Sequence, residues 1–266
     1  MAISGKTAVY GIIADPIGHV RGPTLFNPLF EKLGMDAAMV PFHVTATSLS
    51  RAVAGFRAIE SLRGWLVTNP HKFAMFHLCD QVDASGTRLQ AVNVVRRNTD
   101  DGRLIGGNYD GAGFINGLRH DGIEPKGKDV LMLGAGGAAY AIAFALAEAG
   151  VRRLTIANRT RANAEALAAT TRRFFPGFDV DVGDVAAADQ DLIVNTTSAG
   201  LKSDDPLPLD VAALKSATTV VDIIMNPEMT RLLTLAKGRG CRIHLGRHML
   251  DSQFPLLARH LGVPIS

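Results

Sequence analysis

Over the first eighty residues, short apolar runs alternate with segments in which apolar residues recur at helical spacing. The runs predict strands and the spaced segments predict amphipathic helices. Strands are expected at 7–13, 38–44 and 65–68, and helices at 23–33, 49–59 and 71–78. This β-α-β-α-β-α order favours a parallel sheet. Two later runs, 91–97 and 103–107, flank a polar loop that contains a glycine, and they predict a hairpin.

The same alternation resumes at residue 130, after a predicted helix over 111–118 that Asp110 could cap and a polar linker over 119–128. Further strands are expected at 130–133, 154–157, 191–194, 219–223 and 242–244, and further helices up to residue 150 and at 162–173, 230–237 and 249–261. We therefore predict an α/β protein with two α/β domains, the second of them doubly wound.

A glycine-rich turn follows the apolar run at 130–133 and opens an Ala-rich helix. Gly134, Gly136 and Ala139 form the pattern G-x-G-x-x-A. Such a turn lets a pyrophosphate approach the backbone at the N-terminus of a helix. The pattern alone also occurs in ordinary turns, but a strand before it, a helix after it and a second strand about 20 residues on favour dinucleotide binding. The expected cofactor contacts in this turn are Gly134, Ala135, Gly136, Gly137 and Ala138.

Composition excludes several classes of protein. With 266 residues and 47% hydrophobic residues, the chain is globular and long enough for two modest domains. The net charge of +3 is small and the arginines are scattered, so we expect no nucleic-acid partner. Cys79 and Cys241 cannot form a disulfide framework, and no apolar run has membrane-spanning length. We expect a soluble, cytoplasmic protein with no membrane partner.

Eight short stretches, in this order and spacing, resemble the shikimate dehydrogenase family, including its quinate and shikimate-like relatives. They lie at 11–19, 67–72, 91–93, 107–113, 158–160, 195–200, 222–227 and 249–253. The resemblance covers nearly the whole chain. It implies a substrate-binding domain over 1–111, completed by a C-terminal helix over 247–266, and a Rossmann-like dinucleotide-binding domain over 112–246. It also implies an enzyme of shikimate or quinate metabolism, which acts as a monomer or a homodimer.

The resemblance also implies the reaction, which is reversible hydride transfer between a cyclic hydroxy acid and NAD or NADP. The family's catalytic lysine and aspartate match Lys72 and Asp110. Oxidation of a secondary alcohol requires a base for the hydroxyl proton, and the reverse reaction requires an acid. A free lysine titrates near pH 10.4, and our hypothesis is that partial burial and the positive nicotinamide lower this value while Asp110 orients the amine. Taken singly, the two residues would instead be a surface lysine and a helix-capping aspartate.

The expected carboxylate site departs from the family pattern. Val20, Arg21 and Gly22 stand where the family usually has Ser-x-Ser, whose hydroxyls bind the substrate carboxylate. Loss of two donors to a carboxylate should cost several kcal/mol unless another group replaces them. Arg21 either supplies a bidentate contact or points to solvent.

Other substrate positions are partly retained. Relative to the family pattern, Leu66 replaces a frequent Asn, Tyr109 replaces a Thr, and Met225 replaces a Tyr. The residues expected to contact the substrate at these and the retained positions are Thr68, Asn93, Met225 and Gln253. The catalytic pair is thus kept while the pocket is altered. The substrate is left open between shikimate, quinate and a less polar or differently charged analogue.

The preference between NAD and NADP is also left open. NAD-binding proteins usually place an acidic residue at the end of the second strand of the domain, where this chain has Asn158, Arg159 and Thr160. A neutral end with an arginine suits the 2′-phosphate of NADP, whereas Asn163 stands where NADP-dependent relatives often have a basic residue. The remaining cofactor contacts that the resemblance implies are Thr196, Thr197, Ser198, Ile223, Gly246 and Met249.

Two alternatives remain beside this hypothesis. One is a non-catalytic ligand-binding or sensor protein that retains the fold, and the other is a two-domain dehydrogenase for a different carbon skeleton. No metal site is expected, because His71, His77 and Cys79 lack i,i+4 pairing and a further ligand set. We expect His248 and His260 to be packing or surface residues.

Overall fold

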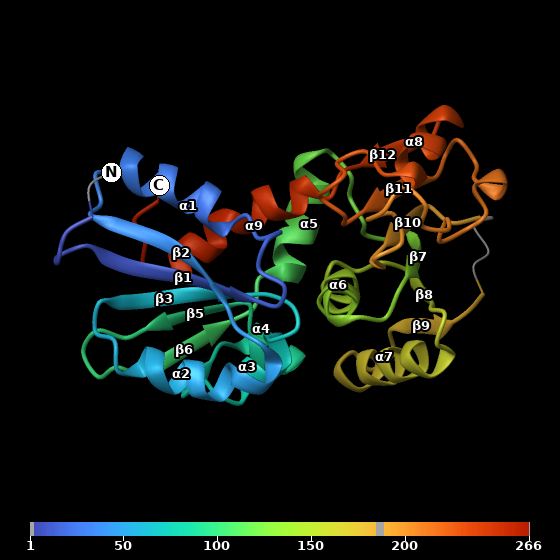
Figure 1. The fold of residues 1–266 in the computed structure, drawn as a ribbon. Helices are drawn as coiled ribbons and strands as arrows, with labels where there is room; N and C mark the ends of the chain where they lie inside the picture. The colour runs from blue at the N-terminus through green and yellow to red at the C-terminus, as the bar shows by residue number, and fades with distance from the viewer. Residues whose placement is uncertain (1–2, 185–188, 266) are drawn as a thin grey trace. The chain divides into compact units, whose positions relative to one another are not determined.

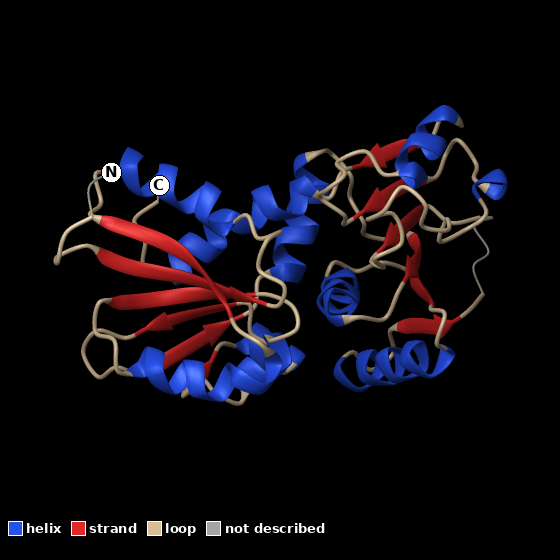
Figure 2. Cartoon of the chain, viewed as in Figure 1, coloured by secondary structure: helices blue, strands red, loops and turns tan. Residues whose placement is uncertain are grey.

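The computed structural model describes residues 3–184 and 189–265, and the chain divides into two compact units (Figure 1). Unit 1 contains Met1–Tyr109 and Pro255–Ser266, and unit 2 contains Asp110–Phe254. Residues 1–2, 185–188 and 266 belong to the predicted domain ranges but lie outside the described residues. Within those residues each unit is built on a six-stranded sheet (Figure 2).

Unit 1 follows the predicted alternation closely. Its strands are β1 (Ala8–Ala14), β2 (Ala37–His43), β3 (Leu62–Val67), β4 (Gln81–Val82), β5 (Val94–Arg97) and β6 (Leu104–Gly107). Its helices are α1 (Gly22–Lys32), η1 (Ala46–Ser48), α2 (Leu49–Arg57), α3 (Lys72–Phe76) and α4 (Ala84–Leu89). The strand order is β2-β1-β3-β5-β6-β4.

The sheet of unit 1 is mixed, whereas the element order predicted a parallel sheet. β1 pairs in parallel with β2 and β3, but β5 runs antiparallel to both β3 and β6. The predicted hairpin is the reason, because two strands joined by a short loop must run in opposite directions. Helices cover both faces, with α1 on one side and α2 and α3 on the other (Figure 1).

Apolar side chains of β1 and β3 supply the core on both faces of this sheet. Tyr10 packs against Phe30 of α1 with ring centroids 5.0 Å apart. On the opposite face Trp65, which is fully buried, packs edge-on against Phe56 of α2 at 5.2 Å. Packed side chains therefore cover both faces of this sheet.

Unit 2 is the predicted doubly wound unit. Its strands are β7 (Asp129–Leu133), β8 (Arg153–Ala157), β9 (Asp179–Val182), β10 (Leu192–Asn195), β11 (Thr219–Asp222) and β12 (Arg242–His244). Its helices are α5 (Asp110–His120), α6 (Gly137–Glu148), α7 (Arg161–Phe174), η2 (Val211–Ala213), α8 (Arg231–Gly238) and α9 (Arg247–His260), whose last residues belong to unit 1. The strand order is β12-β11-β10-β7-β8-β9, and every pairing is parallel.

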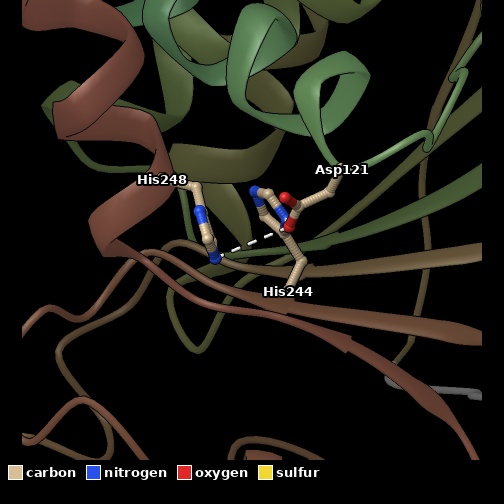
Figure 3. A group of neighbouring side chains, drawn as sticks. All are labelled: Asp121, His244 and His248. Carbon is tan, nitrogen blue, oxygen red and sulfur yellow. Dashed lines mark hydrogen bonds and ion pairs between the residues drawn. The ribbon is translucent and has the colours of Figure 1, made fainter.

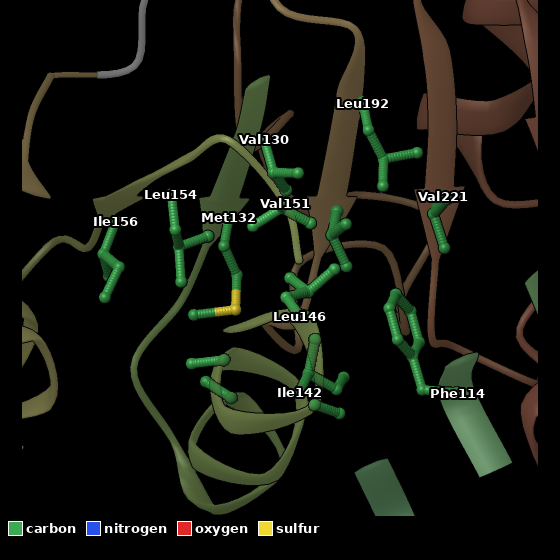
Figure 4. Close-up of a cluster of buried hydrophobic side chains, with 14 of the residues drawn as sticks. Phe114, Val130, Met132, Ile142, Leu146, Val151, Leu154, Ile156, Leu192 and Val221 are labelled. Atoms are coloured by element: carbon green, nitrogen blue, oxygen red, sulfur yellow. The ribbon is translucent and has the colours of Figure 1, made fainter. Parts of the chain in front are cut away.

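The central strand β7 is buried on both faces because its alternate residues meet different helices. Met132 packs with Ile142 and Leu146 of α6 in the larger core cluster (Figure 4). Leu131 faces the other way, into a second cluster that includes Leu232 of α8. A strand covered on both faces reads as a continuous apolar run, which is why residues 130–133 contain no polar side chain.

Besides the short 3₁₀ turns η1 and η2, three elements escaped the sequence-based prediction. β4 has two residues, and β9 has only four, in which Val180 and Val182 alternate with aspartates. Helix α4 contains a glycine and a serine, and the Asp83 side chain caps it by accepting a hydrogen bond of 2.8 Å from the Gly86 amide. No helix among the described residues combines the length and the apolar character that crossing a bilayer requires.

Candidate active site

Lys72 begins α3, directly after the turn that ends β3. The preceding residue, His71, is 1% exposed, and its Nε2 donates a hydrogen bond of 2.7 Å to the Val44 carbonyl. The Lys72 carbonyl accepts a hydrogen bond of 2.9 Å from the Val92 amide. The chain at His71 and Lys72 is therefore fixed by hydrogen bonds to Val44, after β2, and to Val92, before β5. The Lys72 side chain is half-buried.

Two buried asparagines hold the segment that leads to Asp110. The Tyr109 amide donates a 3.2 Å hydrogen bond to Asn93 Oδ1. Asn108, which is 4% exposed, donates from Nδ2 to the Ala91 carbonyl at 3.2 Å. Buried amides must find partners, and these two find them in the backbone of Tyr109, after β6, and of Ala91, before β5. Asn93 was predicted as a site residue, whereas Asn108 was not.

The Tyr109 ring is anchored by His260, from the end of α9. His260 Nε2 donates to the Ile105 carbonyl at 2.9 Å, so its Nδ1 is an acceptor and the Tyr109 hydroxyl, 3.1 Å away, is the donor. Burial lowers the pKa of His260, and burial together with nearby Asp83 raises the pKa of Tyr109. Both shifts favour the neutral forms that this hydrogen bond requires. His260 is thus a packing residue, as expected, with a defined polar role.

Asp110 is the first residue of α5, and its carboxylate lies against α9. Gln253 Nε2 donates a 2.8 Å hydrogen bond to Asp110 Oδ1, and the two side chains are 5% and 6% exposed. The helices approach closely because of Gly113, where an added Cβ would lie 2.6 Å from Gln253 Cβ and 2.9 Å from the Met249 carbonyl oxygen. Unit 2 therefore presents a buried carboxylate that already has an amide donor.

At the expected carboxylate site, Gly22 is enclosed by apolar side chains. A Cβ on Gly22 would lie 3.1 Å from Leu66 Cδ1 and 3.1 Å from the Met39 sulfur. Two of the departures from the family pattern, Gly22 and Leu66, therefore face each other. Arg21 is exposed at the start of α1, and Val20 is half-buried. The only charged side chain in this stretch is thus free to reach a ligand from solvent.

The glycine turn after β7 has the geometry that an anion site needs. Gly134 has φ +109°, and a Cβ there would lie 2.5 Å from Thr196 Oγ1, so only glycine fits. Gly136, the residue before α6, faces open space, because nothing lies within 4 Å of the position that a Cβ would take there. The N-terminus of α6 is therefore open, with amide N–H groups and the positive end of the helix dipole directed outward.

The other predicted cofactor residues of unit 2 gather at the same edge of the sheet, beyond the carboxyl ends of the strands. The chain leaves β7 toward β8 and β9 on one side, and β10 to β12 lie on the other, so β7 and β10 flank the topological switch point. Around it lie Asn158, Arg159 and Thr160 after β8, Thr196, Thr197 and Ser198 after β10, Ile223 after β11, and Gly246 and Met249 after β12. Met225 also follows β11 and is 37% exposed.

No acidic residue occupies the end of β8. Asn158 folds back and donates from Nδ2 to the Thr160 carbonyl at 2.8 Å, and Arg159 is exposed. The neighbouring Arg161 pairs with Glu165 at 3.0 Å. The local charge is therefore neutral to positive.

Comparison with known proteins decides which family these features represent. One family model, the shikimate dehydrogenase substrate binding domain, matches residues 12–95, and a second, shikimate / quinate 5-dehydrogenase, matches residues 119–231. The chain belongs to the shikimate dehydrogenase family. The resemblance predicted from eight short stretches is confirmed, and so is the two-domain α/β fold.

Individual members of the shikimate dehydrogenase family match most of the chain. The shikimate dehydrogenase (NADP(+)) of Bacillus cereus is 39% identical over 256 residues, which cover 92% of this chain and 89% of that protein. The Listeria monocytogenes shikimate 5-dehydrogenase, solved in complex with shikimate and NAD, is 32% identical with a TM-score of 0.88, and the match covers 99% of this chain and 93% of that one. A ligand-free 5-ketofructose reductase from a Gluconobacter strain is also 32% identical, with a TM-score of 0.85 and coverage of 96% and 93%.

One buried carboxylate near the cofactor edge was not singled out from the sequence. Asp222, at the end of β11, is fully buried and accepts hydrogen bonds from Thr230 Oγ1 at 2.8 Å and from the Ile224 amide at 3.0 Å. Burial raises the pKa of Asp222 against the effect of these donors. Thr230 also caps α8, so Asp222 joins the loop after β11 to the start of that helix. The resemblance to the family over residues 222–227 could have pointed to Asp222, but nothing in that stretch indicated that its carboxylate has a structural role.

Proposed function

We propose that this chain catalyses reversible hydride transfer between a cyclic hydroxy acid of the shikimate and quinate type and NAD or NADP, with Lys72 and Asp110 as the acid–base pair. The observation that carries the proposal is the buried Asp110 carboxylate held by Gln253, in a chain that also retains the family's lysine. A protein that only binds a ligand has no need of a proton-transfer pair. The curated relatives are dehydrogenases, which favours the enzyme over a non-catalytic sensor.

The proposed chemistry divides between the cofactor and the protein. The bound nicotinamide supplies the hydride acceptor. The Lys72 amine takes the proton of the substrate hydroxyl during oxidation and returns it during reduction. Asp110 has the orienting role in this pair, and Gln253 keeps its carboxylate in one orientation. A positioned carboxylate of this kind lowers the barrier because it needs no reorganisation during proton transfer.

We assign substrate binding to residues 1–111, completed by 247–266, and dinucleotide binding to residues 112–246. The proposed polar contacts to the substrate ring are Thr68, Asn93 and Gln253, with Met225 as an apolar contact. Arg21 binds the carboxylate in place of the family's two serines, beside Val20 and Gly22. Arginine suits this task because its planar guanidinium matches a carboxylate with two parallel hydrogen bonds.

For the cofactor, the open N-terminus of α6 at Gly136 suits a pyrophosphate, which is supported by the free space at that residue. The neutral Asn158 and the exposed Arg159 are compatible with either ribose or its 2′-phosphate. The Bacillus cereus relative is named for NADP(+), and the Listeria monocytogenes relative was solved with NAD. We therefore propose NAD or NADP and assign no preference between them.

A neutral keto-sugar is a second candidate substrate. Val20 and Gly22 have no hydroxyl that could hold a carboxylate, and Leu66 and Met39 surround Gly22 with apolar atoms. The 5-ketofructose reductase that matches this chain is named for a substrate without that group. Under this alternative Lys72 and Asp110 keep their roles, and Arg21 contacts solvent.

The test is a spectrophotometric assay at the absorbance band of reduced nicotinamide. The panel contains shikimate, quinate, their amino and deoxy analogues, and fructose with 5-ketofructose, each with NAD or NADP in the matching redox state. Lys72→Ala is the catalytic variant, and Lys32→Ala, on the exposed end of α1, is its matched control. We expect turnover of one acid by the wild type and by Lys32→Ala, with a loss of at least about 100-fold in Lys72→Ala.

Turnover of 5-ketofructose alone would replace the cyclic acid by the second candidate. Equal activity of Lys72→Ala and the wild type would refute the proposed base. Binding of a nucleotide without turnover of any compound would favour the sensor alternative. We further propose a cytoplasmic protein that is a monomer or a homodimer. Sedimentation of the purified chain tests the oligomeric state, and fractionation of the cells that produce it tests the location.

A further inference from the structure

Three side chains that lie far apart in the sequence meet at one end of unit 2. Asp121, His244 and His248 each offer one ligand atom, and these atoms all lie within 4.8 Å of one another (Figure 3). Asp121 Oδ2 lies 2.7 Å from His244 Nδ1 and 3.5 Å from His248 Nε2. The two imidazole rings stack at a centroid distance of 4.9 Å and an interplanar angle of 28°. One carboxylate oxygen is thus shared by two imidazoles.

Each of the three residues is held by a different element. His244 ends β12 and is 2% exposed. Asp121 directly follows α5, and Arg242 donates hydrogen bonds to the backbone carbonyls of Asp121 and Gly122, which leaves the Asp121 carboxylate for the histidines. His248 lies in the first turn of α9. The set is therefore built by the packing of a strand and two helices and does not depend on one flexible loop.

Close approach of α5 and α9 places this cluster. A Cβ on Gly117 of α5 would lie 2.8 Å from the His248 carbonyl oxygen, so the two helix backbones touch at that point. Glycine is required there because any side chain would push His248 away from Asp121. The same two helices are also joined at the N-terminus of α5, where Gln253 donates a hydrogen bond to Asp110.

The geometry points to a binding site for one divalent transition-metal ion, with zinc as the first choice, ligated by Asp121, His244 and His248. Zinc lies about 2.0–2.2 Å from nitrogen and oxygen ligands, so tetrahedral ligands are roughly 3.3–3.6 Å apart. The Asp121–His248 distance of 3.5 Å already has this value. The Asp121–His244 pair, at 2.7 Å, opens by less than about 1 Å when the ion replaces the shared proton. Two imidazoles with a carboxylate form a donor set that suits zinc, cobalt, nickel and copper and disfavours magnesium and calcium.

Solvent has access to this site. The Asp121 and His248 side chains are 28% and 21% exposed, so an ion can enter and keep water at its fourth position. A hydrogen-bonded histidine–aspartate pair alone would account for His244 but would not require a second imidazole directed at the same oxygen. The bound ion joins the end of α5 to the start of α9 and thereby stabilises unit 2. This inference does not depend on the proposed dehydrogenase activity.

The experiment measures zinc binding by the full-length chain without an affinity tag. The apo protein, prepared with a chelator, is dialysed against zinc, and bound metal is counted by mass spectrometry. Cobalt serves as a visible probe, because its absorption bands intensify in tetrahedral sites. The variants are His248→Gln and Asp121→Asn. The matched control is His43→Gln, which removes an exposed histidine–aspartate pair with Asp15 that no third ligand joins among the described residues.

We expect one zinc ion per chain in the wild type and in His43→Gln, and at least about 10-fold weaker binding in each of the two cluster variants. At a zinc concentration of about 100 times the wild-type dissociation constant, the melting temperature of the wild type should rise by roughly 5–10 °C, and that of His248→Gln should rise by no more than about half as much. If Asp121→Asn fails to fold, the result for His248→Gln decides whether the site exists. His248 is the more exposed of the two histidines, so its replacement disturbs the fold less. Absence of stoichiometric zinc at about 100 μM, or unchanged binding in His248→Gln, or equal loss in His43→Gln, would overturn the site.

Discussion

Gln253 Nε2 donates a hydrogen bond of 2.8 Å to Asp110 Oδ1, across 143 positions of sequence. Both side chains are almost completely buried, so water cannot replace the donor if it is removed. Gln253 was predicted to contact substrate, and its observed partner is the proposed catalytic carboxylate. The amide therefore has a positioning role whether or not it also touches the substrate.

Replacing Gln253 by Leu should lower kcat about 10- to 100-fold and change KM less. A hydrogen bond to a charged group contributes about 1.5–3 kcal/mol, and this one acts on the group that assists proton transfer. Steady-state kinetics on the substrate found in the panel would measure the effect. Gln81→Leu, at an exposed position of β4, is the control and should leave both constants unchanged. An unaltered kcat in Gln253→Leu would show that catalysis does not depend on the hydrogen bond by which Gln253 orients the Asp110 carboxylate.

Arg21 separates the two candidate substrate classes. If it binds a carboxylate, Arg21→Ala should raise KM for a cyclic acid about 10- to 100-fold, because a charge-assisted pair of hydrogen bonds is lost. The KM for a neutral keto-sugar should stay within about a factor of two. Arg51→Ala, at an exposed position of α2, controls for loss of a surface charge. A KM for the acid that does not respond to Arg21→Ala would mean that the side chain points to solvent.

Gly113→Ala should destabilise the protein by about 1–3 kcal/mol. The new Cβ would lie 2.6 Å from Gln253 Cβ and 2.9 Å from a backbone oxygen of α9, so the two helices must separate. Gly55→Ala, also within a helix, is the opposite case, because nothing lies within 4 Å of its Cβ position. That variant should gain about 0.5–1 kcal/mol from the lower entropy of its unfolded chain. Urea unfolding of both variants measures the contrast, and equal stabilities would contradict it.

Asp222 should make the protein less stable as pH rises through the acid range. Its pKa in the folded chain is raised by burial, so the folded state holds a proton that the unfolded state releases first. The contribution to stability is therefore complete below the unfolded pKa, near 3.9, and is lost as pH rises through the higher folded value. Relative to Asp222→Asn, the wild type should lose free energy of unfolding between pH 4 and pH 7. Parallel curves for the two proteins would show that Asp222 is ionised at its ordinary pKa.

His260 should make the protein less stable as pH falls, which is opposite to the effect of Asp222. Burial lowers its pKa, so the unfolded chain binds a proton more readily than the folded chain. Its contribution is complete above the unfolded pKa, near 6.5, and is lost as pH falls below that value toward the folded pKa. Urea unfolding between pH 8 and pH 5 should show a steeper loss of stability in the wild type than in His260→Gln. A variant that loses stability just as steeply would mean that His260 does not contribute to acid sensitivity.

Much of the fold was predictable from local patterns. The apolar run at 130–133, the glycine turn after it and the Ala-rich helix determine β7, the turn and α6, because periodicity and backbone freedom act over a few residues. Short elements were missed for the same reason. β4 has two residues, too few for any period to be visible, and its place beside β6 is decided by the rest of the sheet.

Local sequence patterns were enough for the family, for the order of most strands and helices, and for the identity of the lysine and the aspartate proposed for catalysis. Only the tertiary structure decided which side chains meet. Gly22 faces Leu66, Asp110 meets Gln253, and Asp121 meets two histidines more than a hundred positions away. Spacing in the sequence carries no information about such contacts, because sheet register and the approach of helices at glycines set them.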